Sequence, residues 1–270
     1  MVINAGGLNI SLNLIYKDEF QNLTKYITNC EPEFYLESSK DFPQFSEKKL
    51  INQTQYFDLF ETDKGILQLQ KQQKTYIGAI LYRGKKAEIY PMVGGFVTEY
   101  LLSQYAFVKW VEEYGQGLFI HSSAIAYGAA GVLFCAKSGT GKSTQRRLWC
   151  KHGAICINDD KNVLALKGDS LVLLPNPWSG KHFEDNNLSR PLKAVIFLYQ
   201  NKENVITVLS KEKALNLLLG QISLPTKDKQ EVWNKIVDKI LALKLINYGC
   251  NMEDEAFIKL SSYLKENGII

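Results

Sequence analysis

The sequence predicts an α/β protein in two parts, with a β-rich domain over residues 1–114 and a domain of mixed strands and helices over residues 115–270. Residues 8–16 alternate apolar and polar side chains, which is the period of a half-buried strand. Beyond residue 115, apolar runs of strand length alternate with segments of helical periodicity, the pattern of an α/β sheet. A glycine-rich turn at residues 136–144 joins one of these runs to a helix.

In the N-terminal part, strands are predicted at residues 8–16, 57–60, 66–70, 75–82 and 87–90. A helix is predicted from residue 96 to residue 114, where aromatic and aliphatic side chains recur at helical spacing. The segment 38–55 is polar with few apolar residues, and this composition predicts a loop.

The C-terminal part begins with a long predicted strand at residues 117–126 and a turn at 127–130. Further strands are predicted at 131–135, 155–158, 162–166, 170–174, 194–199 and 243–248. Helices are predicted at 142–151, 211–220, 228–241 and 253–266. These elements predict a mixed sheet flanked by helices.

The turn at residues 136–144 reads Ala-Lys-Ser-Gly-Thr-Gly-Lys-Ser-Thr and has the character of a phosphate-binding loop. Gly139 and Gly141 allow a tight turn in which successive N–H groups point inward at an anion. The helix that follows presents the positive end of its dipole to the same anion. Alanine occupies position 136, where this pattern usually has its first glycine. The residues predicted to contact the nucleotide are Ser138, Gly139, Thr140, Gly141, Lys142, Ser143 and Thr144.

Two residues of this loop have predicted roles of their own. Lys142 would set an ammonium group among the outer phosphate oxygens, and the Ser143 hydroxyl would bind a magnesium ion. The cofactors predicted from the loop are therefore ATP and Mg²⁺. Pyrophosphate or ADP would also fit, because the loop contacts only phosphate groups.

A second apolar run, residues 155–158, leads into the acidic pair Asp159 and Asp160, seventeen and eighteen residues beyond Lys142. Ligands of open α/β sheets bind at the carboxyl ends of strands. One carboxylate would hold the metal and the other would accept a proton from an attacking hydroxyl. We predict Asp159 beside Ser143 at the metal and keep both carboxylates as candidates for the base. The alternative is a solvated Asn-Asp-Asp turn.

The spacing and composition exclude several other classes. Transporter ATPases need a Leu-Ser-Gly-Gly signature and GTPases need Asn-Lys-x-Asp, and the chain has neither sequence. A net charge of +4 with dispersed lysines gives no support for a nucleic-acid partner. The five cysteines lack disulfide or zinc spacing, and no apolar run reaches 18 residues. We therefore expect a cytoplasmic protein without a membrane partner.

Four stretches in order resemble the HPr kinase/phosphorylase family, which is related to phosphoenolpyruvate carboxykinase. They are residues 120–126, the loop at 136–144, Asn158-Asp159-Asp160, and the Pro-Asn-Pro-Trp-Ser-Gly-Lys stretch at 175–181. The chain looks most similar to HPr-kinase-related proteins of peptide-modification gene clusters. The resemblance implies the P-loop kinase fold of that family, with Mg-ATP-dependent phosphotransfer to a serine hydroxyl. The chain is far shorter than a carboxykinase, which disfavours that activity.

The resemblance also implies further site residues. His121 matches the family histidine that lies near the site, although a lone histidine in an apolar strand is often a hydrogen-bonded core residue. Independently of the resemblance, Lys181 is the candidate cation for the transition state, because phosphoryl transfer depends on charge compensation. Arg190 is the alternative cation.

The predicted function is a serine kinase whose acceptor is a ribosomally made precursor peptide or a protein, selected by the N-terminal domain. Two alternatives remain open from the sequence: a nucleotide-dependent switch that hydrolyses ATP slowly, and a kinase of free serine. Relatives of this kind often assemble, so a homo-oligomer is compatible with the resemblance.

Overall fold

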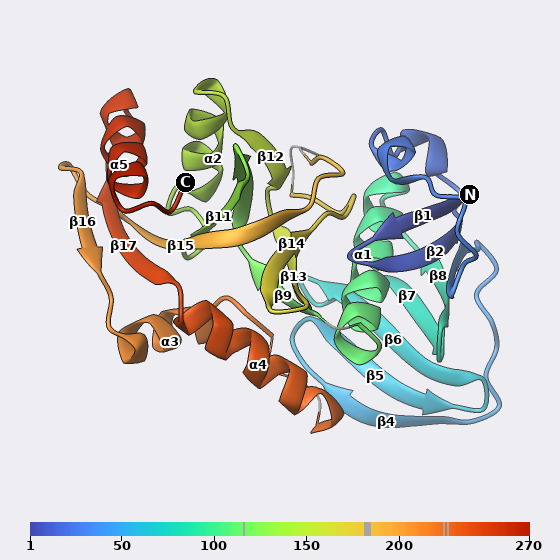
Figure 1. The fold of residues 1–270 in the computed structure, drawn as a ribbon. Helices are drawn as coiled ribbons and strands as arrows, with labels where there is room; N and C mark the ends of the chain where they lie inside the picture. The colour runs from blue at the N-terminus through green and yellow to red at the C-terminus, as the bar shows by residue number, and fades with distance from the viewer. Residues whose placement is uncertain (116, 181–184, 224, 226) are drawn as a thin grey trace. The chain divides into compact units, whose positions relative to one another are not determined.

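The fold is described from a computed structural model of the chain, covering residues 1–115, 117–180, 185–223, 225 and 227–270. The chain divides into two compact units, Met1–Trp110 and Val111–Ile270. Figure 1 shows the strands and helices of each unit, which are described separately below.

The first unit is built on one sheet with the strand order β1-β2-β3-β8-β7-β6-β5-β4. Neighbouring strands are antiparallel except for β2–β3 and β3–β8, which are parallel. The strands are β1 (Val2–Ala5), β2 (Leu8–Asn13), β3 (Phe34–Ser38), β4 (Lys48–Gln53), β5 (Phe57–Thr62), β6 (Gly65–Gln72), β7 (Thr75–Arg83) and β8 (Lys86–Pro91).

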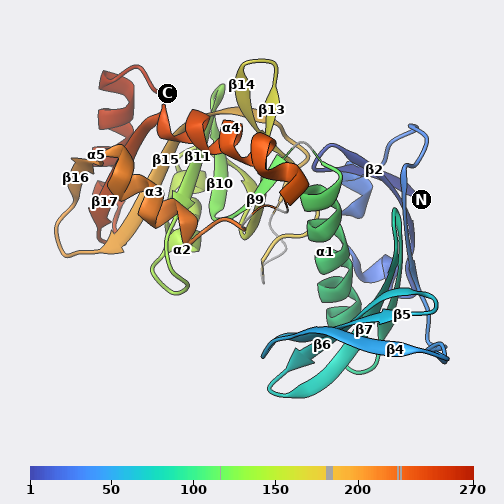
Figure 2. The same ribbon diagram turned by 90° about the horizontal axis from the view of Figure 1, so that it is seen from below.

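Helix α1 (Phe96–Glu113) covers one face of this sheet, because its apolar residues need a partner surface. Trp110 is fully buried, and its ring centroid lies 5.1 Å from that of Phe34 on β3. Gly78 on β7 allows the close approach: a Cβ atom there would meet Leu102 Cδ1 of α1 at 2.7 Å. Figure 2 shows the helix from below, alongside the sheet of this unit.

The prediction of a loop over residues 38–55 is wrong, because this segment contains strand β4 (Lys48–Gln53). β4 is the edge strand of the sheet and pairs only with β5 among the described residues. Its six side chains are all exposed, so neither face carries the alternating burial that marks a strand in a sequence.

The second unit is a mixed sheet of nine strands in the described residues, with the order β12-β10-β11-β15-β14-β13-β9 and β17 and β16 beyond β15. The strands are β9 (Gly117–His121), β10 (Ser123–Tyr127), β11 (Ala130–Cys135), β12 (Ile155–Asn158), β13 (Lys161–Lys167), β14 (Ser170–Leu174), β15 (Arg190–Gln200), β16 (Val205–Val208) and β17 (Lys244–Cys250).

Helices cover both faces of this sheet, as Figures 1 and 2 show. They are α2 (Lys142–Lys151), α3 (Lys211–Leu219), α4 (Gln230–Leu241) and α5 (Asp254–Glu266). Side chains of α2 and α5 pack in the core on one face, and those of α3 and α4 pack in the core on the other. With α1, the described residues contain five α-helices, which confirms the predicted mixed α/β class. None of these helices has both the length and the apolar composition that a membrane span requires.

The strand predicted at residues 117–126 is two strands that separate at Ser122. β9 pairs with β13, whereas β10 pairs with β11 and β12. Ser122 is held at the break, because its N–H donates to Asp160 O and its carbonyl oxygen accepts from Asn162 Nδ2. The strand pairing therefore changes within three residues.

The strand directions bring three polar segments to one edge of the sheet. β11 and β15 are parallel, so the residues after Cys135 and after Gln200 lie at the same edge. β12 is antiparallel to β10, and β10 is antiparallel to β11, so β12 also ends there. The loop after Cys135 and the turn after Asn158 carry the predicted site residues.

Candidate active site

The loop after β11 turns through left-handed backbone at two glycines and leads directly into α2. Gly139 has φ of 79° and Gly141 has φ of 117°, values that residues with a Cβ atom rarely adopt. Helix α2 begins at Lys142 and ends at Lys151, as the sequence predicts. Ser138 and Thr140 lie within the loop, and Ser143 and Thr144 lie in the first turn of the helix. The N–H groups of that first turn have no partner within the helix and suit an anion.

Lys142 is buried at the base of this loop, with 8% of its surface exposed. Its Nζ donates hydrogen bonds to the carbonyl oxygens of Ala136 (2.8 Å) and Lys137 (3.4 Å). Burial lowers the pKa of Lys142 from its ordinary value, and the nearby carboxylates of Asp160 and Asp159 oppose this shift. The ammonium group is thus held by the loop itself and lies within electrostatic reach of both aspartates.

Asp159 is buried and both of its carboxylate oxygens accept hydrogen bonds. The Ser123 hydroxyl donates to Oδ1, and Arg146 Nη2 lies 3.2 Å from Oδ2. The side chains of Arg146 and Asp159 are 2% and 3% exposed, so this ion pair is removed from water. Arg146 comes from α2 and Ser123 from the start of β10, so three elements converge on this carboxylate.

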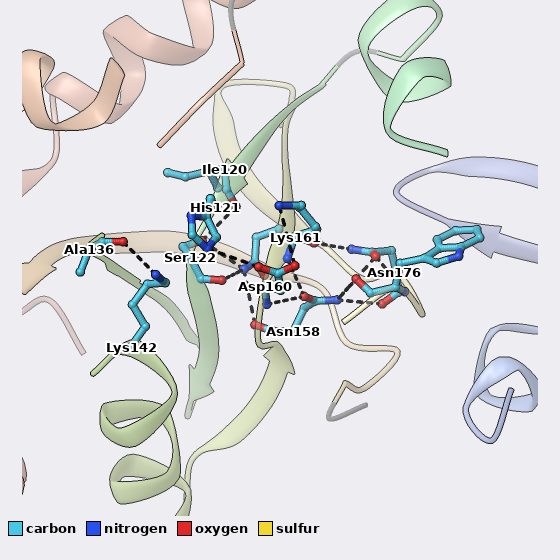
Figure 3. Close-up of polar contacts among 11 residues, drawn as sticks. Ile120, His121, Ser122, Ala136, Lys142, Asn158, Asp160, Lys161 and Asn176 are labelled. Atoms are coloured by element: carbon cyan, nitrogen blue, oxygen red, sulfur yellow. Dashed lines mark hydrogen bonds and ion pairs between the residues drawn. The ribbon is translucent and has the colours of Figure 1, made fainter. Parts of the chain in front are cut away.

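Asp160 is the more open carboxylate, with 28% of its side chain exposed. His121 Nε2 lies 3.3 Å from Asp160 Oδ1, and Lys161 Nζ lies 3.7 Å from Oδ2. Figure 3 shows His121 and Asp160 pointing toward one another, with Lys142 and the Ala136 carbonyl group to one side. The arrangement gives a partly exposed carboxylate near the glycine-rich loop.

His121 stays in its neutral form more readily than an ordinary histidine. Burial lowers its pKa, and the positive charges of Lys142 and Lys161 lower it further, whereas Asp160 raises it. The contact between His121 Nε2 and Asp160 Oδ1 therefore has less ion-pair character than one made by an ordinary histidine. The backbone N–H of His121 donates to Gln221 O at 2.7 Å, which fixes the end of β9.

Three asparagines hold the turn that carries the acidic pair. Asn158 Oδ1 accepts from the backbone N–H groups of Asp160 and Lys161, both at 3.0 Å. Asn158 Nδ2 donates to the carbonyl oxygens of Asn176 and Trp178 (Figure 3). Asn162 holds Ser122, as described above, and Asn176 Nδ2 donates to Lys161 O. This buried network fixes the backbone on both sides of Asp160.

The segment 175–180 packs against this turn. Trp178 is fully buried, and Gly180 lies so close to the acidic pair that a Cβ atom there would be 3.3 Å from Asp160 Cβ. The predicted cation Lys181 lies outside the described residues. The alternative cation, Arg190, is at the opposite end of β15 from Gln200, and its Nε donates to Gly128 O in the turn between β10 and β11. Arg190 is therefore at the edge of the sheet opposite the glycine-rich loop.

The structure brings together Lys142, Asp159, Asp160 and His121 from helix α2, strand β9 and the turn between β12 and β13. Sequence reasoning missed Ser123 and Arg146, the partners of Asp159, and Lys161 beside Asp160. One signal for Arg146 was available: it lies four residues after Lys142, on the same face of the predicted helix. The asparagines gave a turn signal only, because the residues that they hold are distant in sequence.

No family model matches the chain, and none of the curated proteins matches its sequence. Among solved structures, the chain is similar to the Hpr(Ser) kinase/phosphatase from Coxiella burnetii. The TM-score is 0.25 and the identity is 15%, over 44% of this chain and 93% of that one. This likeness to a kinase/phosphatase is weak, and we draw no conclusion about this chain from it.

Proposed function

We propose that this protein is a kinase of the P-loop type that transfers the γ-phosphate of Mg-ATP to a serine-type hydroxyl of a peptide or protein. One observation carries the proposal: Asp160, a partly exposed carboxylate beside His121, lies at the same sheet edge as a glycine-rich loop with a buried lysine. A phosphate site alone would serve any nucleotide-binding protein. The adjacent carboxylate adds a group that can accept a proton from a hydroxyl.

The phosphates would bind to the backbone N–H groups of residues 138–144, with Lys142 exchanging the Ala136 carbonyl oxygen for phosphate oxygens. The donor set fits magnesium, because the Ser143 hydroxyl and the aspartate carboxylates are the hard oxygen ligands that this ion prefers. When bound, magnesium would compensate charge on the phosphates. Ser143 would hold it, and Asp159 would have to release Ser123 or Arg146 in order to join.

In the transfer step, the acceptor oxygen attacks the γ-phosphorus in line, and the bond to the bridging oxygen of the leaving diphosphate breaks. The proton of the acceptor hydroxyl passes to Asp160. His121 and Lys161 hold the two oxygens of Asp160, so the carboxylate is oriented before the acceptor arrives. A serine hydroxyl as acceptor, and a precursor peptide as its carrier, are supported by the resemblance of the motifs to HPr-kinase-related proteins.

The test is mass-spectrometric phosphotransfer from Mg-ATP to serine-containing precursor peptides encoded nearby, a carrier protein and free serine. We expect a gain of one phosphate on a single acceptor. Asp160→Asn should lower the rate about 100-fold or more, the range of general-base catalysis, and should leave the Kd for ATP within about threefold. Asp169→Asn is the matched control, because Asp169 is fully exposed on the hairpin between β13 and β14.

The other outcomes each point to a different function. Slow ATP hydrolysis without transfer to any acceptor would contradict the kinase proposal and support a nucleotide-dependent switch. Faster transfer to free serine than to any peptide would overturn the macromolecular acceptor. Loss of ATP binding in Asp160→Asn would overturn the assignment of Asp160 as the base and give it a role at the metal.

A further inference from the structure

A pocket of about 770 Å³ opens beside the phosphate-binding loop. Residues 136–140 of the loop form one wall, and residues 197–200 at the end of β15 form another. Asn247 of β17 and the C-terminal end of α3, with Leu217 and Gln221, complete it. The volume falls in the range of about 300–1,000 Å³ that is typical of small-molecule sites.

The strand order separates this pocket from the acidic pair. β12, which leads into Asp159 and Asp160, lies on one side of β11, whereas β15 and β17 lie on the other. If the outer phosphate faces Asp160, the rest of the nucleotide extends from the loop toward β15. The pocket is therefore where a nucleoside would go once its phosphates are bound.

The chemistry of the walls suits a purine base. Phe197, Tyr199 and Leu217 supply apolar surface for a flat ring, and Leu217 is 43% exposed without such a ring. The side chains able to form hydrogen bonds to the base include the amides of Asn216, Gln221 and Asn247. Gln221 Oε1 is buried and accepts no hydrogen bond from the described residues. A rotation of the Gln221 side chain would bring Oε1 to the pocket, where a ligand N–H group would supply the missing donor.

We infer that this pocket binds the purine of the phosphate donor and accepts adenine and guanine alike. Both bases carry an exocyclic amino group that can donate to Gln221 Oε1. An amide side chain offers a donor and an acceptor and can turn to suit either base, whereas a fixed carboxylate would favour guanine. Carboxylates are not among the described residues that line the pocket. The inference rests on the proposed function, because it assumes that a nucleotide occupies the loop.

Isothermal titration calorimetry with Mg-ATP, Mg-GTP and Mg-tripolyphosphate tests this assignment on the full chain. Tripolyphosphate reports on the loop alone. Leu217→Trp would fill the pocket, and Leu219→Trp is the matched control, because Leu219 is similarly exposed on the same helix but does not line the pocket. We expect ATP and GTP to bind within about tenfold of one another. Leu217→Trp should weaken both by about tenfold or more and leave tripolyphosphate binding unchanged.

The remaining outcomes separate the two levels of the proposal. Unchanged ATP affinity in Leu217→Trp would contradict the assignment of this pocket as the purine site, but it would leave the kinase proposal standing. A preference for one purine by more than about 100-fold would contradict the inference that the pocket accepts both adenine and guanine. Failure of the wild-type protein to bind tripolyphosphate would overturn the phosphate loop and with it both proposals. If Leu219→Trp weakens nucleotide binding as much as Leu217→Trp does, the effect comes from a disturbance of helix α3. This result would contradict the assignment of the pocket.

Discussion

Arg146 and Asp159 form a buried ion pair that joins the helix after the glycine-rich loop at residues 136–141 to the turn that carries the acidic pair. Nη2 and Oδ2 are 3.2 Å apart, and both side chains are almost completely shielded from water. The remaining oxygen of Asp159 accepts from Ser123. A charge in this position depends on its partner, because an unpaired carboxylate in the interior is strongly unfavourable.

We expect Arg146→Met to lower the free energy of unfolding by about 3–5 kcal/mol, because it leaves the Asp159 carboxylate buried without its cation. The measurement is urea denaturation of the unliganded protein. Arg147→Met is the matched control: Arg147 is the next residue and is exposed, so its loss should change the free energy by less than about 0.5 kcal/mol. Adding Asp159→Asn to Arg146→Met should recover much of the loss. Equal effects of the two arginine substitutions would contradict this role.

The lowered pKa of His121 makes stability depend on pH in a defined direction. The unfolded chain, whose histidine titrates near 6.5, binds this proton more readily than the folded protein does. As the pH falls below about 6.5, the wild-type protein should therefore lose stability relative to His121→Gln, until the folded pKa is passed. Above about pH 7.5 the two unfolding free energies should run parallel. Chemical denaturation across this range measures the difference, and parallel curves throughout would show that folding leaves this pKa unchanged.

Lys142→Met should weaken ATP binding while changing the free energy of unfolding only slightly. The ammonium group contacts only loop carbonyl oxygens in the described structure, so its loss should change the unfolding free energy by about 1 kcal/mol or less. A charged hydrogen bond to phosphate contributes about 1.5–3 kcal/mol, so ATP should bind about 10- to 150-fold more weakly. Calorimetry measures the affinity, with Arg147→Met as a control that removes one positive charge from the same helix. Unaltered ATP affinity would exclude Lys142 from the phosphate site.

Gly180→Ala should impair transfer more than nucleotide binding. The new Cβ atom would be 3.3 Å from Asp160 Cβ and 3.7 Å from Asp159 O, which is tight enough to shift Asp160, the proposed base, by a few tenths of an ångström. Because reaction rates fall steeply when a catalytic group moves, we expect kcat to fall about tenfold while the Kd for ATP stays within about twofold. Steady-state kinetics and calorimetry test this split. An equal loss in both would indicate a general disturbance of the fold.

Much of the second unit could be predicted from the sequence, because its strands are buried and its loop has a strong local pattern. Helix α2 and strand β14 have the predicted bounds. The edge strand β4 escaped prediction, because its exposed side chains carry no burial pattern. The break at Ser122 also escaped, because hydrogen bonds from residues about 40 positions away hold it open.

The site shows the same division between local and distant information. The loop residues and the acidic pair are each contiguous in sequence, so their pattern was visible. The partners of the acidic pair come from β10, α2 and β13, and only the fold brings them together. A sequence can suggest that a carboxylate is functional, but the difference between buried Asp159 and partly exposed Asp160 depends on tertiary contacts.

The break between β9 and β10 has a mechanical consequence. His121 contacts Asp160, Ser122 donates its N–H to Asp160 O, and Ser123 contacts Asp159. Three successive residues, 121–123, thus contact two successive residues, Asp159 and Asp160. A displacement of this short segment would carry both carboxylates with it, so Asp159 and Asp160 would move together relative to the loop at residues 136–144.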